Sequence, residues 1–161
     1  MTDLEFAIKM EQDGEKYYTE QAEINKDNAL HSVCLMLAED EKNHARILID
    51  MMNKMPWQLT QTDTLSKAQN VFQGMGDIKT QFKATAKQTD FYAFAAKREQ
   101  ESIDLYTKYL AKAQGTEEKE LFEYLIEQEK QHFAVLDELA QWLRRADEWI
   151  EDARFGIREE Y

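Results

Sequence analysis

Glutamate and histidine are the residues of this chain best placed to do chemistry, because they occur in two trios with the same internal spacing. Each member of the second trio follows its counterpart by 88 residues: Glu11, Glu41 and His44, then Glu99, Glu129 and His132. Carboxylates with two imidazoles form an oxygen-rich ligand set, which suits Fe²⁺ or Mn²⁺ better than a structural zinc site built on thiolates does. The doubled pattern therefore predicts a site for two metal ions.

A repeat of the surrounding sequence accompanies the doubled trio. Residues 4–51 align with residues 92–139 without a gap, and thirteen of these 48 positions are identical. The alternative is that the glutamates are solvated surface charges of an acidic helical protein. The repeat argues against that alternative, and so does the energy needed to bury four glutamates without cations or protons.

Helical periodicity covers most of the chain and predicts an all-α fold. Only five Gly and one Pro interrupt the 161 residues, which suits long helices better than strands. The expected helices run from Thr2 or Asp3 to about Ile24, from about Asn28 to Pro56, from Thr89 or Asp90 to Ala113, and from Thr116 through Leu143, the last inward residue of its stripe. Short connections within each pair, with residues 57–88 as a long crossover, predict a ferritin-like four-helix bundle of two antiparallel hairpins.

Length and composition narrow the classes of function. A chain of 161 residues is expected to form one domain, with residues 144–161 as a C-terminal extension. The net charge of −12 and the pI near 4.7 oppose binding to nucleic acid or to anionic lipid. The start of the chain lacks the pattern of a signal peptide, and no segment has the apolar length of a membrane span, so a cytoplasmic protein is predicted. The single Cys34 excludes an internal disulfide and a rubredoxin-type iron centre in this chain.

The spacing within each trio explains how both members of a Glu-x-x-His pair reach one site. Residues three apart on a helix are separated by about 60° around the axis and about 4.5 Å along it, so Glu41 and His44 can face the same ions. Tyr18 and Tyr106 follow the first glutamate of each trio by seven residues, on the same helical stripe. These tyrosines are candidates for hydrogen-bonding a ligand or passing electrons, and the alternative is that they are core aromatics.

Other polar residues near the trios are weaker candidates. Asp40 and Gln128 precede the two histidines by four residues and could orient the ligands. Glu15 is expected at the rim of the site, because its repeat partner is Ile103. His31 is expected to be an ordinary residue in a first helical turn, and Cys34 to fill the core.

The paired E-x-x-H motifs, the E-x-x-G and E-x-x-S variants on the first and third helices, and the tyrosine seven positions later resemble the ferritin-like domain of the rubrerythrin family. The resemblance covers Leu4 to about Leu143. It implies a non-haem diiron centre that reduces hydrogen peroxide as the iron cycles between ferrous and ferric states. It further implies that Glu41 and Glu129 bridge the two ions, and that the terminal ligands are Glu11, Glu99, His44 and His132.

Two departures from the family pattern qualify the implied activity. Typical members also carry a rubredoxin domain, which is not found in this chain, so electrons are expected from a separate donor protein. Typical members also have a further glutamate where this chain has Ser102, which implies a more symmetric site, closer to the diiron centre of bacterioferritin.

Three functions are compatible with the six ligands. The first is redox chemistry on hydrogen peroxide or O₂. The second is iron binding and storage with ferroxidase activity, and the third is oxygenation of an organic substrate through an apolar channel. The C-terminal aromatic residues Trp142, Trp149, Phe155 and Tyr161, together with Ile150, supply apolar surface for a subunit interface or a capping extension, and a homodimer is favoured.

Overall fold

The computed structural model describes the backbone of residues 1–74 and 86–159, and the side chains of residues 1–74 and 90–144. The described residues form helices and no strand. The helices are α1 (Asp3–Ile24), α2 (Leu30–Met52), α3 (Thr64–Gly74), α5 (Ala86–Lys112) and α6 (Thr116–Glu159). The predicted all-α, ferritin-like architecture is confirmed.

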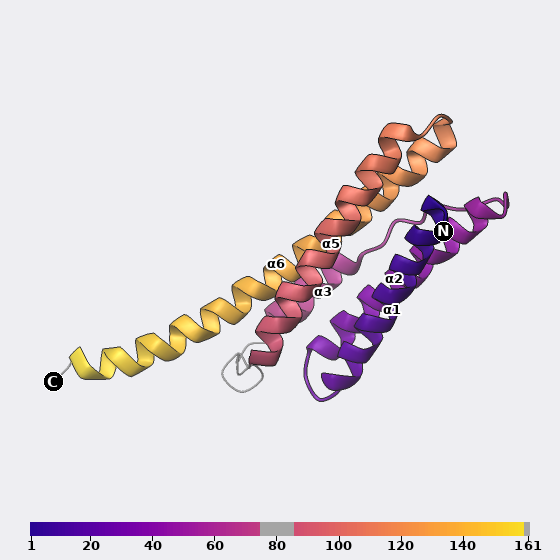
Figure 1. The fold of residues 1–161 in the computed structure, drawn as a ribbon. Coiled ribbons are helices and arrows are strands. Elements are labelled where there is room, and N and C mark those ends of the chain that lie inside the picture. The colour runs from indigo at the N-terminus through magenta and orange to yellow at the C-terminus, as the bar shows by residue number, and fades with distance from the viewer. Residues whose placement is uncertain (75–85, 160–161) are drawn as a thin grey trace.

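The four long helices form two antiparallel hairpins, one from each half of the sequence repeat (Figure 1). Helices α1 and α2 form the first hairpin, and helices α5 and α6 form the second. The last turns of α6 extend past the ends of the other helices (Figure 1). This arrangement brings the two copies of the repeat face to face, so residues 88 positions apart occupy equivalent places.

The helix ends follow from local sequence. Thr2 caps α1 with a reciprocal pair of hydrogen bonds, because its side chain accepts from the Glu5 N–H while the Glu5 carboxylate accepts from the Thr2 N–H. Helix α2 ends at Met52, before the predicted end at Pro56, and Lys54 then adopts a left-handed backbone with φ of 55°. Helix α5 begins at Ala86, a few residues earlier than predicted, and α6 continues to Glu159, through most of the predicted C-terminal extension.

Part of the crossover predicted over residues 57–88 is helical, because Thr64–Gly74 form α3, a helix that was not predicted. One stripe of α3 is buried and consists of Thr64, Ala68 and Phe72, spaced four residues apart. This stripe packs α3 against α6 and α2. Three inward residues, one of them polar, are enough to pack a short helix against an existing bundle. So few residues give only a weak periodic signal in the sequence.

Two apolar clusters form the core and lie on either side of the trios. In all four long helices the candidate ligands fall between the two clusters along the chain. One cluster contains Tyr18, Val33, Leu37, Phe91, Ala95, Leu136 and Leu139 among others. The other contains Ala7, Ile8, Leu48, Tyr106, Leu121 and Leu125 among others. The ligand layer is therefore flanked on both sides by packed apolar side chains.

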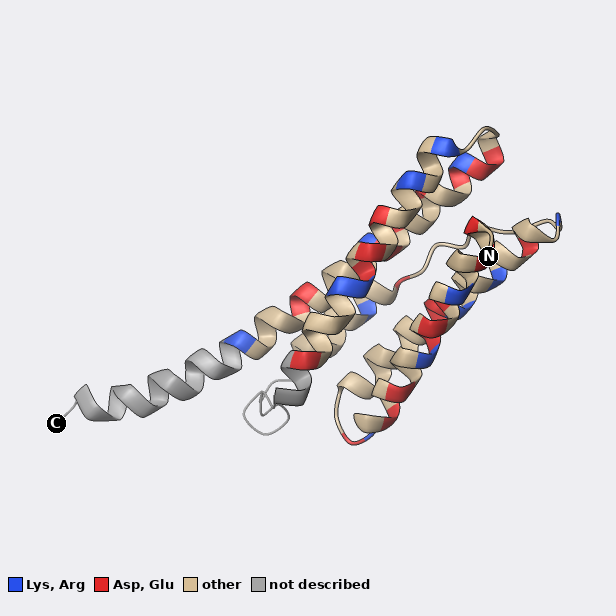
Figure 2. Ribbon diagram, in the orientation of Figure 1, with Lys and Arg blue, Asp and Glu red and all other residues tan. Residues whose placement is uncertain are grey.

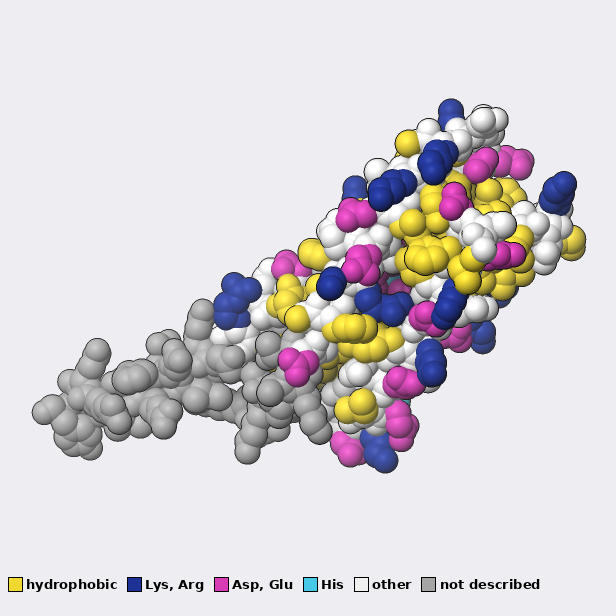
Figure 3. Space-filling model, viewed as in Figure 1, with side chains coloured by type: hydrophobic (Ala, Val, Ile, Leu, Met, Phe, Trp, Pro, Cys, Tyr) yellow, Lys and Arg dark blue, Asp and Glu magenta, His cyan; other side chains and the backbone are white. Residues whose placement is uncertain are grey.

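Acidic and basic residues are interspersed along the described parts of the helices (Figure 2). On the face shown in Figure 3, hydrophobic side chains gather in patches between these charges. Among the described residues, no helix has the length and apolar character needed to cross a bilayer.

Candidate metal centre

The structure brings the six predicted ligands together in the middle of the bundle. All six are at most 5 % exposed. Their ligand atoms form two groups, and within each group these atoms lie within 4.8 Å of one another. One group holds Glu11, Glu41, His44 and Glu129, and the other holds Glu41, Glu99, Glu129 and His132. Glu41 and Glu129 belong to both groups, which is the placement that bridging ligands require.

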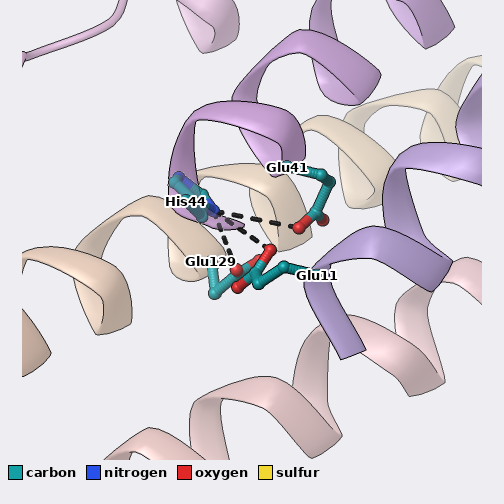
Figure 4. A group of neighbouring side chains, drawn as sticks. All are labelled: Glu11, Glu41, His44 and Glu129. Carbon is teal, nitrogen blue, oxygen red and sulfur yellow. Dashed lines mark hydrogen bonds and ion pairs between the residues drawn. The ribbon is translucent and has the colours of Figure 1, made fainter. Parts of the chain in front are cut away.

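His44 is the centre of the first group (Figure 4). Its Nδ1 atom lies 3.2 Å from Glu129 Oε1, 3.4 Å from Glu11 Oε2 and 3.8 Å from Glu41 Oε2. These carboxylates come from α6, α1 and α2, so three helices converge on one imidazole nitrogen.

His132 occupies the equivalent place in the second group. Its Nδ1 atom lies 3.3 Å from Glu99 Oε1, 3.5 Å from Glu41 Oε1 and 3.5 Å from Glu129 Oε2. The two imidazole rings stack with their centroids 5.7 Å apart. The two groups thus sit side by side and share one pair of carboxylates.

Several polar atoms of the site are buried without a hydrogen bond, which is the observation that tests whether a metal fits here. These atoms are Gln128 Nε2 and four atoms on residues of the two groups, namely Glu11 Oε2, Glu99 Oε2, Glu129 Oε2 and His132 Nδ1. Among the described residues, the ion pairs made by the four glutamates are with histidine and not with Lys or Arg. Buried acceptors without donors destabilise the fold, and cations between them would satisfy these atoms. The donor set therefore fits a pair of divalent metal ions.

Protons neutralise the site when no metal is bound. Burial, together with the charges of Glu11 and Glu99, raises the pKa of Glu41 to about 8. Burial and the neighbouring carboxylates raise the pKa of Glu129 well above its usual range. Burial alone would lower the pKa values of the two histidines, but Glu11 beside His44 and Glu99 beside His132 raise both well above the usual value.

The other two glutamates stay ionised. Burial alone would raise the pKa of Glu11 and of Glu99, but protonated His44 lowers the first well below its usual range and protonated His132 lowers the second to about 2. The shifts thus favour protons on Glu41, Glu129 and both histidines, which offset the charge of the ionised glutamates in the metal-free pocket.

Two buried tyrosines brace the outer glutamates across the hairpins. Tyr18 donates its hydroxyl hydrogen to Glu99 Oε1 at 2.5 Å, and Tyr106 donates to Glu11 Oε1 at 2.5 Å. Burial and the adjacent glutamates raise the pKa values of both tyrosines well above 10, so the hydroxyls remain donors. Each hairpin therefore orients a carboxylate that belongs to the other hairpin.

Replacing Tyr106 with phenylalanine is expected to lower the free energy of unfolding of the metal-free chain by about 1.5–3 kcal/mol, the contribution of a hydrogen bond to a charged group. Tyr109 on the same helix is the matched control, because its hydroxyl donates to the neutral backbone carbonyl of Asp3. Tyr109→Phe should cost only about 0.5–1.5 kcal/mol. Urea denaturation measures the free energy of unfolding of both variants. Equal losses in the two variants would contradict a stabilising hydrogen bond from Tyr106 to ionised Glu11.

The outward nitrogens of the two histidines also have partners. His132 Nε2 lies 2.9 Å from Asp40 Oδ2, and His44 Nε2 lies 3.2 Å from Gln128 Oε1. Asp40 and Gln128 thus contact the histidine of the other hairpin, not the one four residues ahead. Thr64 donates to Asp40 Oδ2 at 2.6 Å, and Thr62 donates to Gln128 Oε1 at 3.4 Å. Sequence analysis missed both threonines, since nothing in their spacing distinguishes them from loop residues.

Gly14 keeps open the side of the pocket near Glu41. A Cβ atom at Gly14 would lie 3.2 Å from Cδ of Glu41 and 3.3 Å from Nη2 of Arg98, tighter than ordinary contact. Ser102, its counterpart in the repeat, is buried, and its hydroxyl donates to the Arg98 carbonyl at 3.0 Å.

The remaining candidates lie outside both groups. Glu15 is half-buried and belongs to neither group. His31 places Nδ1 2.8 Å from the carbonyl oxygen of Ala22, near the start of α2. Cys34 is buried in an apolar cluster, and burial raises its pKa to about 12. Trp142 packs against the same cluster, while Trp149, Ile150, Phe155 and Tyr161 fall outside the residues whose side chains are described.

Comparison with known proteins gives one family. The sequence model of the family described as Rubrerythrin matches residues 3–140, which include all six candidate ligands and both tyrosines. A search of curated proteins found no match, and a search of solved structures found none either.

Proposed function

Because the chain belongs to the rubrerythrin family, we propose that it is a non-haem diiron protein that reduces hydrogen peroxide or O₂ with electrons from a separate donor protein. The observation that best supports this proposal is the pair of buried groups that share Glu41 and Glu129. Glu11 and His44 would complete one iron site, and Glu99 and His132 the other. Each ion would then have one imidazole and one carboxylate of its own.

The chemistry that a bound pair of iron ions supplies is one-electron transfer from each metal to an O–O bond. The chain's own residues hold the ions side by side and exclude bulk water. The apolar clusters on either side of the ligand layer provide that exclusion. Tyr18 and Tyr106 keep Glu99 and Glu11 fixed through the hydroxyl contacts described above. Reduction of one peroxide molecule to two water molecules consumes two electrons and two protons, so a two-iron site matches one peroxide.

Stopped-flow mixing of the anaerobic ferrous protein with hydrogen peroxide tests the proposal. We expect one peroxide molecule to oxidise two irons without release of hydroxyl radical, which a spin trap would detect. Oxidation of one iron per peroxide would contradict the proposed function. Uptake of many more than two irons per chain would instead support storage with ferroxidase activity.

Metal binding is expected to release more than one proton per chain near pH 7. Metal ligands must be deprotonated, and in the metal-free pocket Glu41, Glu129 and both histidines hold protons, as their raised pKa values indicate. Affinity should therefore rise steeply with pH through the neutral range. Calorimetric titration with Mn²⁺ in two buffers that differ in ionisation enthalpy counts the protons. Release of one proton or none would contradict the charge state described above.

A further inference from the structure

The side chains that contact the outward nitrogens of the two histidines differ in chemistry between the two halves of the centre. Asp40 and Gln128 are 88 residues apart and are therefore counterparts in the repeat. Both are buried, at 6 % and 1 % exposure. The six ligands and both tyrosines are identical between the halves, but this outer pair is a carboxylate in one half and an amide in the other.

The contacts of these two residues are equivalent in placement and different in chemistry. In both cases a side-chain oxygen faces the histidine Nε2, at 2.9 Å for Asp40 on His132 and at 3.2 Å for Gln128 on His44. In both histidines Nδ1 faces the carboxylates of the metal groups. A metal held at Nδ1 would leave Nε2 protonated, so Asp40 and Gln128 would both accept a hydrogen bond from it.

The segment between the hairpins fixes both acceptors. Thr64, the first residue of α3, donates to the same Asp40 oxygen that faces His132. Thr62 donates to the Gln128 oxygen that faces His44. The sequence contains one such segment, so it contacts the two halves through different residues. The difference between the halves is therefore supported by a buried contact at Asp40 and a half-buried one at Gln128.

A carboxylate behind a metal-bound histidine makes that imidazole a stronger donor than an amide does, because the negative charge stabilises the positive charge that the metal places on the ring. Partners of this kind change metal affinity by about 10–100-fold. The two ions would therefore be bound with different strengths despite identical direct ligands.

We propose that the two metal positions are inequivalent, and that Asp40 makes the position at His132 fill before the position at His44. This inference rests on the proposed function, because it assumes that both positions bind metal. Asp40 and Gln128 act through the histidines and are positioning residues. An ordered filling would give the chain a mononuclear state with the metal at His132 and a vacant neighbouring position at His44.

Histidine NMR distinguishes the two positions directly, because the chain has only three histidines and His31 lies outside the site. Metal-free protein labelled with ¹⁵N at histidine would be titrated with Zn²⁺, which is diamagnetic. At one equivalent we expect the His132 ring resonances to shift nearly completely, and the His44 resonances to shift with the second equivalent. His31 should remain unchanged and serves as the internal control.

Two variants test whether the outer residues set this order. Asp40→Asn should weaken binding at His132 by about 10–100-fold and remove the order of filling. Gln128→Glu should strengthen binding at His44, so that both histidines shift in parallel, and it tests the inference even if Asp40→Asn fails to fold. The matched control is Glu39→Gln, which removes a charge from the exposed residue next to Asp40 and should leave the order unchanged.

The outcomes separate this inference from the proposed function. If His44 shifts first in the unmodified chain, or both histidines shift together, the inference is overturned while the two-metal site stands. The inference is also overturned, and the two-metal site also stands, if Gln128→Glu and Asp40→Asn both fold and His132 still shifts before His44 in both variants. If neither histidine responds to two equivalents of Zn²⁺, both the inference and the proposed site are wrong.

Discussion

Glu129→Gln is expected to reduce metal binding from two ions to at most one per chain and to slow peroxide-driven iron oxidation by more than about 100-fold. Loss of an outer partner of a metal ligand already costs about 10–100-fold, and Glu129 is a shared direct ligand in the proposed centre. Its two carboxylate oxygens face different histidines, at 3.2 Å from His44 and 3.5 Å from His132. Glutamine keeps the volume of the side chain but lacks the charge and one of these oxygens.

The matched control is Glu127→Gln, two residues earlier on α6, where the side chain is exposed. This variant removes the same charge from the same helix and should retain two ions and the full rate. Elemental analysis gives the metal content, and stopped-flow absorbance gives the rate. If Glu129→Gln retained two ions and oxidised them at the original rate, Glu129 would not be a bridging ligand.

Binding of metal is expected to raise the unfolding temperature by about 10–20 °C. A ligand at 100 times its Kd stabilises the folded state by about 2.7 kcal/mol, so two ions contribute about 5 kcal/mol. A domain of this size gains about 2–4 °C per kcal/mol. The physical source of the gain is the set of buried oxygens that have no hydrogen bond in the metal-free pocket.

Differential scanning calorimetry with and without Mn²⁺ measures this shift under conditions in which the metal is not oxidised. Glu129→Gln should lose most of the shift, and Glu127→Gln should keep it. A shift of the same size in both variants would mean that the stabilising ions bind elsewhere on the acidic surface.

The spacing of a few residues was enough to predict the fold and the gathering of the six candidate ligands. Glu-x-x-His at Glu41 and Glu129 places both members of each pair on one helical face, and the repeat duplicates that face. Because the repeat is offset by 88 residues, the two hairpins are equivalent. Packing one hairpin against the other therefore brings both trios of candidate ligands to one centre. The place of Tyr18 and Tyr106 near the site could be predicted in the same way, because each lies about two turns from a candidate ligand on its own helix.

Contacts across the bundle were less accessible from the sequence. The tyrosines brace glutamates of the opposite hairpin, and Asp40 and Gln128 contact histidines of the opposite hairpin, because helix faces that meet are not neighbours in sequence. Thr62 and Thr64 support the site from a segment with little periodicity. Helix α3 was missed for the same reason, since Thr64, Ala68 and Phe72 are its only buried residues.

The central claim is that two metal ions lie between the six ligands, and anomalous X-ray diffraction at the iron edge tests it most directly. Crystals of the chain loaded anaerobically with ferrous iron should show two peaks in the middle of the bundle, one beside Nδ1 of His44 and one beside Nδ1 of His132. Both peaks should contact Glu41 and Glu129. Peaks confined to surface carboxylates, or a bundle interior without anomalous signal, would contradict the account.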